Sequence, residues 1–267
     1  MTQPAFSTQT VQSCCVSLYS HPLVGWLLGN SLHPGGLKLT EQLTDLLELD
    51  SRSHVLDIGS GTGASAVHIA KRVRCRVTGI TLEPSGVESG TKLAIEQGVP
   101  HLVNFIEGDF HTADLDKNSF DAVLMECVLS TIPDKPAALA RIVALLKPGG
   151  RLGLTDVTVD GPLPSDLDAV LLTAGCVGGA LPLDDYRALV KQAGLTINGS
   201  QPLPQVAQNF MRDLSGKLMM AEAATKLGKI EIPDGGIDTA KALLASARDA
   251  ATNGRLGYAL LTAIKPN

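Results

Sequence analysis

Apolar residues recur along this chain with two periods, which predict strands alternating with helices. Short apolar runs that end at glycine or a charged residue are typical of buried parallel strands. We expect such strands at 54–58, 76–80, 103–106, 120–125 and 151–156, with helices at 64–73 and 85–96 and one that Asp134 caps and Lys147–Gly150 ends. Strands separated by helices of this length indicate βαβ units and a mostly parallel sheet covered on both faces.

Less regular segments flank this alternating region. Before it, Ser17–Gly36 predicts a short helical cover, and four leucines recur at helical spacing behind Thr40: Leu39, Leu43, Leu46 and Leu47. After it, the pattern predicts a short helix at Asp166–Thr173, helices at 183–193, 205–227 and 239–253, and strands at 195–200 and 257–264. The 205–253 stretch is therefore expected to be a helical insertion before a closing strand.

Composition and charge narrow the class of protein. The chain has 267 residues, of which 44% are apolar and 18% charged, with a mean hydropathy of +0.17. This is the composition of a globular protein. The net charge is −5 without a basic block, which argues against nucleic-acid binding. No apolar run reaches the roughly 20 residues of a membrane helix, and Met1–Thr10 does not resemble a secretion signal, so we expect a cytoplasmic protein without membrane contact.

A glycine-rich turn follows the first predicted strand, in the segment Asp57–Ala64 (DIGSGTGA). A backbone that turns sharply into a helix and lets a ligand approach its amides favours residues without a β-carbon. The turn also fits the pattern G-x-G-x-x-A, with Glu83 about 20 residues later, so a dinucleotide site stays open. A tight turn that binds nothing stays open as well.

Three further motifs turn this pattern into a family resemblance. Gly108-Asp109-Phe110 follows the third strand, Phe120-Asp121 opens the fourth, and Leu146–Gly150 (LKPGG) precedes the fifth. Together with Asp57, these motifs over residues 54–156 resemble the class I S-adenosylmethionine-dependent methyltransferases. The resemblance implies a Rossmann-like fold with a mostly parallel seven-stranded sheet and S-adenosylmethionine as the cofactor. The implied single domain spans 1–267, with a cover at 1–50, a cofactor-binding core at 51–200, and the helical insertion and closing strand at 201–267.

The same resemblance implies roles for individual residues. The three turn glycines would lie near the methionine part of the cofactor: Gly59, Gly61 and Gly63. Asp57 is expected among the cofactor-binding residues. Asp109 would accept a hydrogen bond from the adenine amino group, with Phe110 beside the ring. Tyr19 resembles the N-terminal tyrosine that touches the cofactor in relatives, although a packing role stays open for it.

One position departs from the family at the end of the second strand. Relatives usually hold the ribose hydroxyls with an acidic residue, whereas Gly79–Pro84 (GITLEP) places Thr81 there, followed by Leu82. This segment resembles the tocopherol and cyclopropane-synthase branches, in which a hydroxyl replaces the carboxylate. We favour Thr81 over Glu83 as the ribose partner.

Two cysteine motifs indicate a specific acceptor. Cys127 lies in ECVLSTIPDK after the fourth strand, and Cys176 lies in GCVGGAL, 49 residues later. Over residues 54–200 these motifs resemble the arsenite methyltransferases, which implies that Cys127 and Cys176 bind trivalent arsenic. Thiolates are the ligands that a soft centre prefers. The expected partners are a trivalent arsenical substrate and a thiol reductant.

Several alternatives remain beside this hypothesis. The helix at 64–73 lacks the cysteine that relatives often carry, so Cys14 or Cys15 could supply a third thiol, or both could be incidental. Cys75 is expected to fill the core, although its flanking arginines could lower its pKa. If all the cysteines are packing residues, the protein would methylate a small organic acceptor of the quinone or tocopherol type. A third hypothesis is a metalloid-binding protein without turnover.

Overall fold

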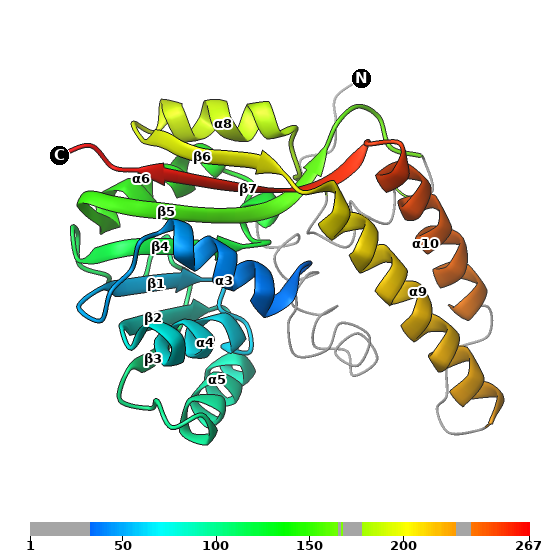
Figure 1. Ribbon diagram of the computed structural model, residues 1–267, viewed down its shortest axis with the longest axis horizontal. Helices are drawn as coiled ribbons and strands as arrows, with labels where there is room; N and C mark the ends of the chain where they lie inside the picture. The colour runs from blue at the N-terminus through cyan, green and yellow to red at the C-terminus, as the bar shows by residue number, and fades with distance from the viewer. Residues whose placement is uncertain (1–32, 165–166, 168–177, 228–235) are drawn as a thin grey trace.

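A sheet of seven strands forms the centre of the computed structural model, which describes residues 33–164, 167, 178–227 and 236–267 (Figure 1). The strand order is β3-β2-β1-β4-β5-β7-β6. Strands β1 to β5 are parallel, and β7 is antiparallel to both β5 and β6. The bounds are β1 His54–Ile58, β2 Arg76–Thr81, β3 Val103–Glu107, β4 Phe120–Glu126, β5 Leu146–Val159, β6 Thr196–Pro202 and β7 Leu256–Ile264. The predicted Rossmann-like fold is confirmed.

Helices cover both faces of the sheet. On one face lie α3 (Gly36–Leu46), α4 (Ala64–Val73) and α5 (Pro84–Glu96), and on the other lie α6 (Lys135–Leu145) and α8 (Leu183–Gln192) (Figure 1). The two long helices α9 (Pro204–Lys226) and α10 (Gly236–Thr252) pack on each other and extend away from the sheet (Figure 1). A 3-10 turn, η1 (Leu129–Thr131), lies between β4 and α6.

The central strands β1 and β4 are buried on both sides, which explains their continuous apolar sequences. Successive side chains of a strand point to opposite faces. In β4, Val123 and Met125 belong to the core beneath α6 and α8, whereas Ala122 and Leu124 belong to the core beneath α3 and α4. The next residue on the same side of β4 as Ala122 and Leu124 is Glu126, which is polar instead of apolar.

The local signal that begins a helix is confirmed at α6, whereas the predicted stop at Lys147–Gly150 lies in β5, because the helix already ends at Leu145. The Asp134 side chain accepts a hydrogen bond from the Ala137 amide at 2.9 Å, and Pro136 lies in the first turn. Such a cap satisfies one of the amides that the first turn leaves unpaired. The helix therefore begins where the sequence predicts.

The largest differences from the predicted boundaries are at α3 and β5. Helix α3 begins at Gly36, so Thr40 is a buried residue of its second turn, and Leu46 is 40% exposed instead of facing the core. Strand β5 is longer than 151–156 at both ends, because it pairs with β7 from Arg151 to Val159 and with β4 from Leu146. The predicted helix at 166–173 and most of the predicted cover lie outside the described residues. No helix in the described part of the chain is long and apolar enough to cross a membrane.

Candidate functional site

A pocket of about 110 Å³ opens beyond the carboxyl ends of the central strands. It lies where the strand order reverses between β1 and β4, the position at which open α/β sheets bind ligands. Its lining comes from the ends of β1, β2 and β3 and from the loop after β4: Ile58, Gly59, Ile80, Thr81, Leu82, Gly108, Asp109, Phe110, Val128, Thr131 and Ile132. Five residues that the sequence proposed for the cofactor are thus brought together.

The three turn glycines have different structural roles. All have positive φ, at 71° for Gly59, 51° for Gly61 and 79° for Gly63, which glycine adopts at little cost. A β-carbon on Gly59 would lie 2.6 Å from Val128 at the pocket wall. A β-carbon on Gly63 would instead lie 2.7 Å from the α-carbon of Gly90 in α5. Gly59 therefore keeps the pocket open, whereas Gly63 allows α4 and α5 to pack closely.

The ends of β2 and β3 orient polar groups at the pocket. Thr81 is buried, while Glu83 precedes the first turn of α5 and its carboxylate accepts a hydrogen bond from Ser85. The geometry therefore agrees with Thr81 as the pocket residue. The Asp109 carboxylate is oriented by a 2.9 Å hydrogen bond from the His111 amide to its Oδ1 atom.

Two buried polar atoms in the glycine turn have no hydrogen-bond partner among the described residues. They are Asp57 Oδ2 and Ser60 Oγ. An unpaired buried atom of this kind costs about 1–3 kcal/mol unless a ligand or water satisfies it. Burial, and then the charge of Glu126, raises the pKa of Asp57 well above its usual value. Open backbone and unsatisfied polar atoms in one turn, at the border of the pocket that Gly59 lines, fit a polar cofactor that binds at the turn.

Glu126, at the end of β4, joins three segments through one buried carboxylate. Thr40 of α3 donates a hydrogen bond to Oε1 at 3.0 Å, and Ser65 of α4 donates to Oε2 at 2.6 Å. The His33 ring nitrogen Nε2 lies 3.5 Å from the same oxygen. These contacts satisfy a carboxylate that would otherwise be costly to bury. Glu126, which directly precedes Cys127, therefore connects the end of β4 to α3 and α4.

Cys127 takes an unusual backbone conformation directly after β4. Its φ is 61°, which is uncommon for a residue with a β-carbon, and its amide donates to the Thr155 carbonyl at 2.7 Å. The residue is half-buried, and the next residue, Val128, lines the pocket. Such strained conformations cluster at functional sites. The predicted position of Cys127 at the carboxyl edge is confirmed.

A second group of buried ionisable residues lies at the end of β5. The Asp156 carboxylate accepts the Ser130 amide at 2.9 Å and the Val157 amide at 2.8 Å. Burial raises the pKa of Asp156 to about 6, and burial lowers the pKa of Lys135 at the start of α6. The Lys135 ammonium donates to the carbonyls of Ile132 at 2.9 Å and Ser130 at 3.4 Å.

Sequence reasoning did not identify Glu126, Lys135 or Asp156 as site residues. A signal existed for two of them: each is the polar residue that ends a run of apolar strand residues, in FDAVLME and RLGLTD. Lys135 is the last residue of the ECVLSTIPDK motif, but a lysine in a first helical turn is ordinarily exposed, so the motif did not indicate a buried role for it.

The remaining cysteines divide between the core and the part of the chain that is not described. Cys75 is fully buried in the core beneath α3 and α4, as expected. The suggestion that its flanking arginines lower its pKa was wrong, since burial raises it to about 11. Cys14, Cys15, Tyr19 and Cys176 lie outside the described residues. Within those residues, no group of three or more His, Cys, Asp or Glu side chains could hold a metal ion.

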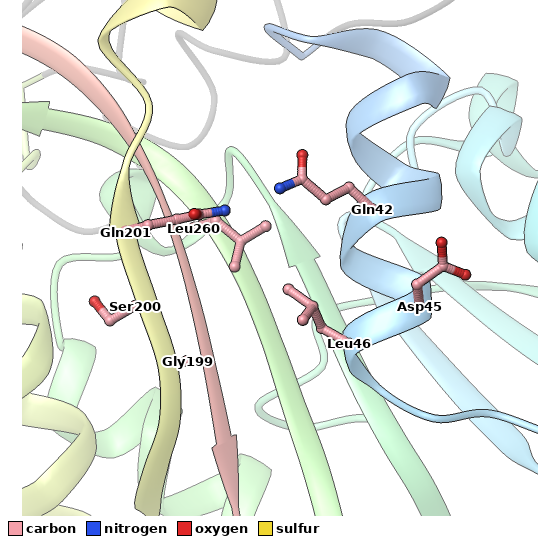
Figure 2. A pocket seen from close by; sticks show the side chains of 7 residues that line it. All are labelled: Gln42, Asp45, Leu46, Gly199, Ser200, Gln201 and Leu260. Carbon is pink, nitrogen blue, oxygen red and sulfur yellow. The ribbon is translucent and has the colours of Figure 1, made fainter.

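Two larger pockets lie beside α3. One, of about 370 Å³, separates α3 from the strands β6 and β7, and the amides of Gln42 and Gln201 point into it from opposite sides (Figure 2). The other, of about 510 Å³, lies between α3 and α9, and His33 contributes to its wall. No residue that the sequence proposed for the cofactor lines either pocket, so the pocket at the strand ends remains the candidate cofactor site.

The sheet order and the glycine-bordered pocket define a Rossmann-like protein of the methyltransferase type. The sequence matches the family described as "Methyltransferase domain" over residues 49–198. Since this is more than half of the chain, the protein belongs to that family.

Relatives with different acceptors match at similar identity. The chain is 29% identical over 268 residues to the 27-O-demethylrifamycin SV methyltransferase of Amycolatopsis mediterranei, covering 92% of this chain and 93% of the relative. It is 30% identical over 199 residues to an arsenite methyltransferase of Aquipseudomonas alcaligenes, covering 66% and 54%. It is 28% identical over 178 residues to methyltransferase GfsG of Streptomyces halstedii, and spans just under two thirds of that protein, 64%. The matches therefore establish that the chain is a methyltransferase but do not identify a particular methyl acceptor.

Solved structures agree on the fold. Phosphoethanolamine N-methyltransferase 2 of Haemonchus contortus, in complex with S-adenosyl-L-methionine, matches with a TM-score of 0.80 at 18% identity, covering 100% of this chain and 62% of that one. A putative sarcosine dimethylglycine methyltransferase of Galdieria sulphuraria matches with a TM-score of 0.77 at 16% identity, covering 96% and 98%. At these identities the likeness establishes the fold.

Proposed function

We propose that this S-adenosylmethionine-dependent methyltransferase transfers methyl groups to a trivalent arsenical held by the thiolates of Cys127 and Cys176. The observation that carries the proposal is the place of Cys127. It directly follows β4, in a strained conformation, and the next residue, Val128, belongs to the pocket wall. An acceptor bound to its sulfur would therefore face the cofactor.

The pocket residues suit the separate parts of the cofactor. Asp109, oriented by the His111 amide, would accept the adenine amino group, and Phe110 would lie beside the ring. Thr81 would give the ribose one hydrogen bond in place of the usual carboxylate. Asp57 and the backbone at Gly59 would receive the methionine end, where unsatisfied polar atoms need a partner. Leu82 would cover the pocket from the end of β2.

The loop that follows Cys176 supports a joint role for the two thiols. Gly179 is three residues after Cys176, and a β-carbon on it would lie 2.2 Å from the carbonyl oxygen of Ser130. Ser130 is itself three residues after Cys127. Three residues span at most about 10 Å, so the length of chain from this contact to each cysteine permits the two thiols to meet, as the proposal requires.

The chemistry matches these ligands. S-adenosylmethionine supplies an electrophilic methyl group on a sulfonium. Two thiolates leave the arsenic lone pair available, and it forms the As–C bond as the S–C bond breaks. Arsenic carries no proton, so the chain needs no general base. Arsenic is formally oxidised, so a thiol reductant must return it to the trivalent state. Holding the acceptor in line with the methyl group is worth about 7–11 kcal/mol in well-oriented systems.

A methylation assay with cysteine variants tests the proposal. The protein is incubated with S-adenosylmethionine, glutathione and either arsenite or methylarsenite, and methylated arsenicals are quantified. We expect turnover by the wild type and a loss of roughly 100-fold or more in Cys127→Ser and Cys176→Ser. Cys75→Ala, which changes a core cysteine, is the matched control and should keep its activity. Full activity of the double Cys127→Ser, Cys176→Ser variant would rule out the mechanism in which the two thiolates bind arsenic.

A neutral organic acceptor is the second candidate, because of the groove between α3 and α9. Its volume of about 510 Å³ exceeds what an arsenic oxyacid needs, and Phe210 and Leu214 give it apolar walls beside the amides of Gln205 and Asn209. The relative that matches over almost the whole chain is named for an organic acceptor. Methyl transfer to a hydroquinone without arsenic, unaffected by the two cysteine changes, would establish this function instead.

A further inference from the structure

The backbone of Ser130 is held between a buried acid and a buried base. Asp156, 2% exposed, accepts the Ser130 amide at 2.9 Å, and Lys135, 7% exposed, donates to the Ser130 carbonyl at 3.4 Å. Lys135 also donates to Ile132 at 2.9 Å. Two ionisable side chains from β5 and α6 thus hold the two peptide groups that flank Ser130, in the loop that begins at Cys127.

Burying both side chains is costly, so their arrangement requires an explanation. Lysine and aspartate are almost never fully buried unless they are paired. Here each binds backbone groups of the β4–α6 loop or the adjoining strand, which satisfies the charges and fixes the loop. The loop carries Cys127 at one end and pocket residues Val128, Thr131 and Ile132 along its length.

The residues that follow Cys176 from Gly178 onward pack on the Ser130 carbonyl. At Gly179, a β-carbon would meet the Ser130 carbonyl oxygen at 2.2 Å and the Lys135 ammonium at 3.0 Å. The next residues are then tied to β5, because the Val159 amide donates to the Leu181 carbonyl at 3.2 Å. A residue without a side chain is therefore required where this segment crosses the Lys135–Ser130 contact.

We propose that Lys135 and Asp156 are positioning residues that hold the Cys127 loop in place and provide the surface on which residues 178–181, which follow Cys176 in the chain, dock through Gly179. The proposal rests on the proposed function in giving the two thiols one shared role. It adds Lys135 and Asp156 as the residues that set their separation. Lys135 is the last residue of the ECVLSTIPDK motif, and Asp156 lies outside both cysteine motifs. Neither Lys135 nor Asp156 touches the acceptor in this scheme.

Thiol cross-linking measures this positioning without arsenic. In a Cys14→Ser, Cys15→Ser, Cys75→Ala background, only Cys127 and Cys176 remain, and dibromobimane becomes fluorescent once it has joined two thiols. We expect rapid cross-linking in this background, and a rate about tenfold lower after Lys135→Met or Gly179→Ala. Lys147→Met, which removes a lysine paired with Asp121 elsewhere, and Gly178→Ala, which changes an exposed neighbour, are the matched controls.

Two further measurements separate positioning from a loss of folding. The Kd for S-adenosylmethionine should stay within about twofold in Lys135→Met and Gly179→Ala, while the KM for methylarsenite rises about tenfold, because the second thiol is no longer presented to bound arsenic. If Lys135→Met does not bind the cofactor, the cross-linking rate and the KM of Gly179→Ala test the positioning role instead.

Each remaining outcome bears on one proposal. Unchanged cross-linking in a folded variant overturns the positioning role, as does a wild-type background that does not cross-link. Cross-linking that depends on Lys135 and Gly179, in a protein that methylates no arsenical, supports the positioning role and rejects the proposed acceptor.

Discussion

The carboxyl edge of the sheet has two halves that are built on different principles. The half formed by β1, β2 and β3 consists of a glycine turn and short loops around the pocket, with backbone in the positive φ region at Gly59 and Gly108. The half formed by β4 and β5 contains buried ionisable side chains: Glu126, Lys135 and Asp156. The comparison indicates that the first half binds by close approach of backbone, while the second fixes loops with buried charge.

The two halves also differ in what their residues cost the fold. Glycine loses more backbone entropy on folding than other residues do. A buried charge destabilises the fold by several kcal/mol unless hydrogen bonds satisfy it. Glu126 and Asp156 each receive hydrogen bonds from two or more residues. In the other half, Asp57 of β1 is also buried with a raised pKa, but its Oδ2 atom has no partner among the described residues. The buried carboxylates of the β4–β5 half are the ones that hydrogen bonds satisfy, and substituting Asp156 should have a large and pH-dependent effect on stability.

The largest expected effect is the pH dependence of stability that Asp156 produces. Its pKa is about 6 in the folded protein, against an ordinary value of 3.8, so the folded state holds the proton more tightly. The resulting stabilisation is complete below about pH 4 and is lost as the pH rises through about 6. At 1.36 kcal/mol per pH unit, this amounts to about 3 kcal/mol.

Urea unfolding of the wild type and Asp156→Asn at several pH values measures this contribution. The difference in unfolding free energy between the two proteins should change by about 3 kcal/mol between pH 4 and 6 and stay constant above that range. The same pH dependence in both proteins would contradict the prediction and remove this distinction between the two halves.

The next effect tests close approach in the other half. Gly59→Ala places a β-carbon against Val128 and strains a positive φ, so we expect the Kd for S-adenosylmethionine to rise roughly 30-fold, which corresponds to about 2 kcal/mol. Gly98→Ala is the matched control, because Gly98 has a φ of 73° with nothing within 4 Å of the added carbon. That variant should lose some stability but bind the cofactor normally, as measured by calorimetric titration. Equal affinities in the two variants would show that close approach at Gly59 is unimportant.

The smallest effect concerns the connection between α4 and β4. Ser65→Ala removes the 2.6 Å hydrogen bond to Glu126 and should lower the unfolding free energy by about 1.5 kcal/mol, since hydrogen bonds to charged groups contribute more than neutral ones. Ser119→Ala, which loses an exposed hydrogen bond to the Asp116 carbonyl, should change it by less than about 0.5 kcal/mol. A larger loss in Ser119→Ala than in Ser65→Ala would show that the Glu126 contacts do not stabilise the fold.

Much of the fold was predictable because its signals are local. The strand His54–Ile58 and the helix Ala64–Val73 occur with the predicted bounds, since an apolar run and a glycine turn fix them over a few residues. The errors at α3 and β5 arose where long-range packing decides. Thr40 is buried inside its helix because it reaches Glu126, and β5 extends because β7 pairs along it.

The sequence by itself determined the order of strands and helices, the glycine turn and the placement of Cys127 at the carboxyl edge, because neighbours along the chain specify these features. Only the tertiary structure decided that Glu126 binds Thr40, 86 residues away, and that Asp156 binds the Ser130 amide, 26 residues away. The physical reason is that burial and hydrogen-bond partners, which shift a pKa and fix a loop, depend on which distant segments the fold brings together.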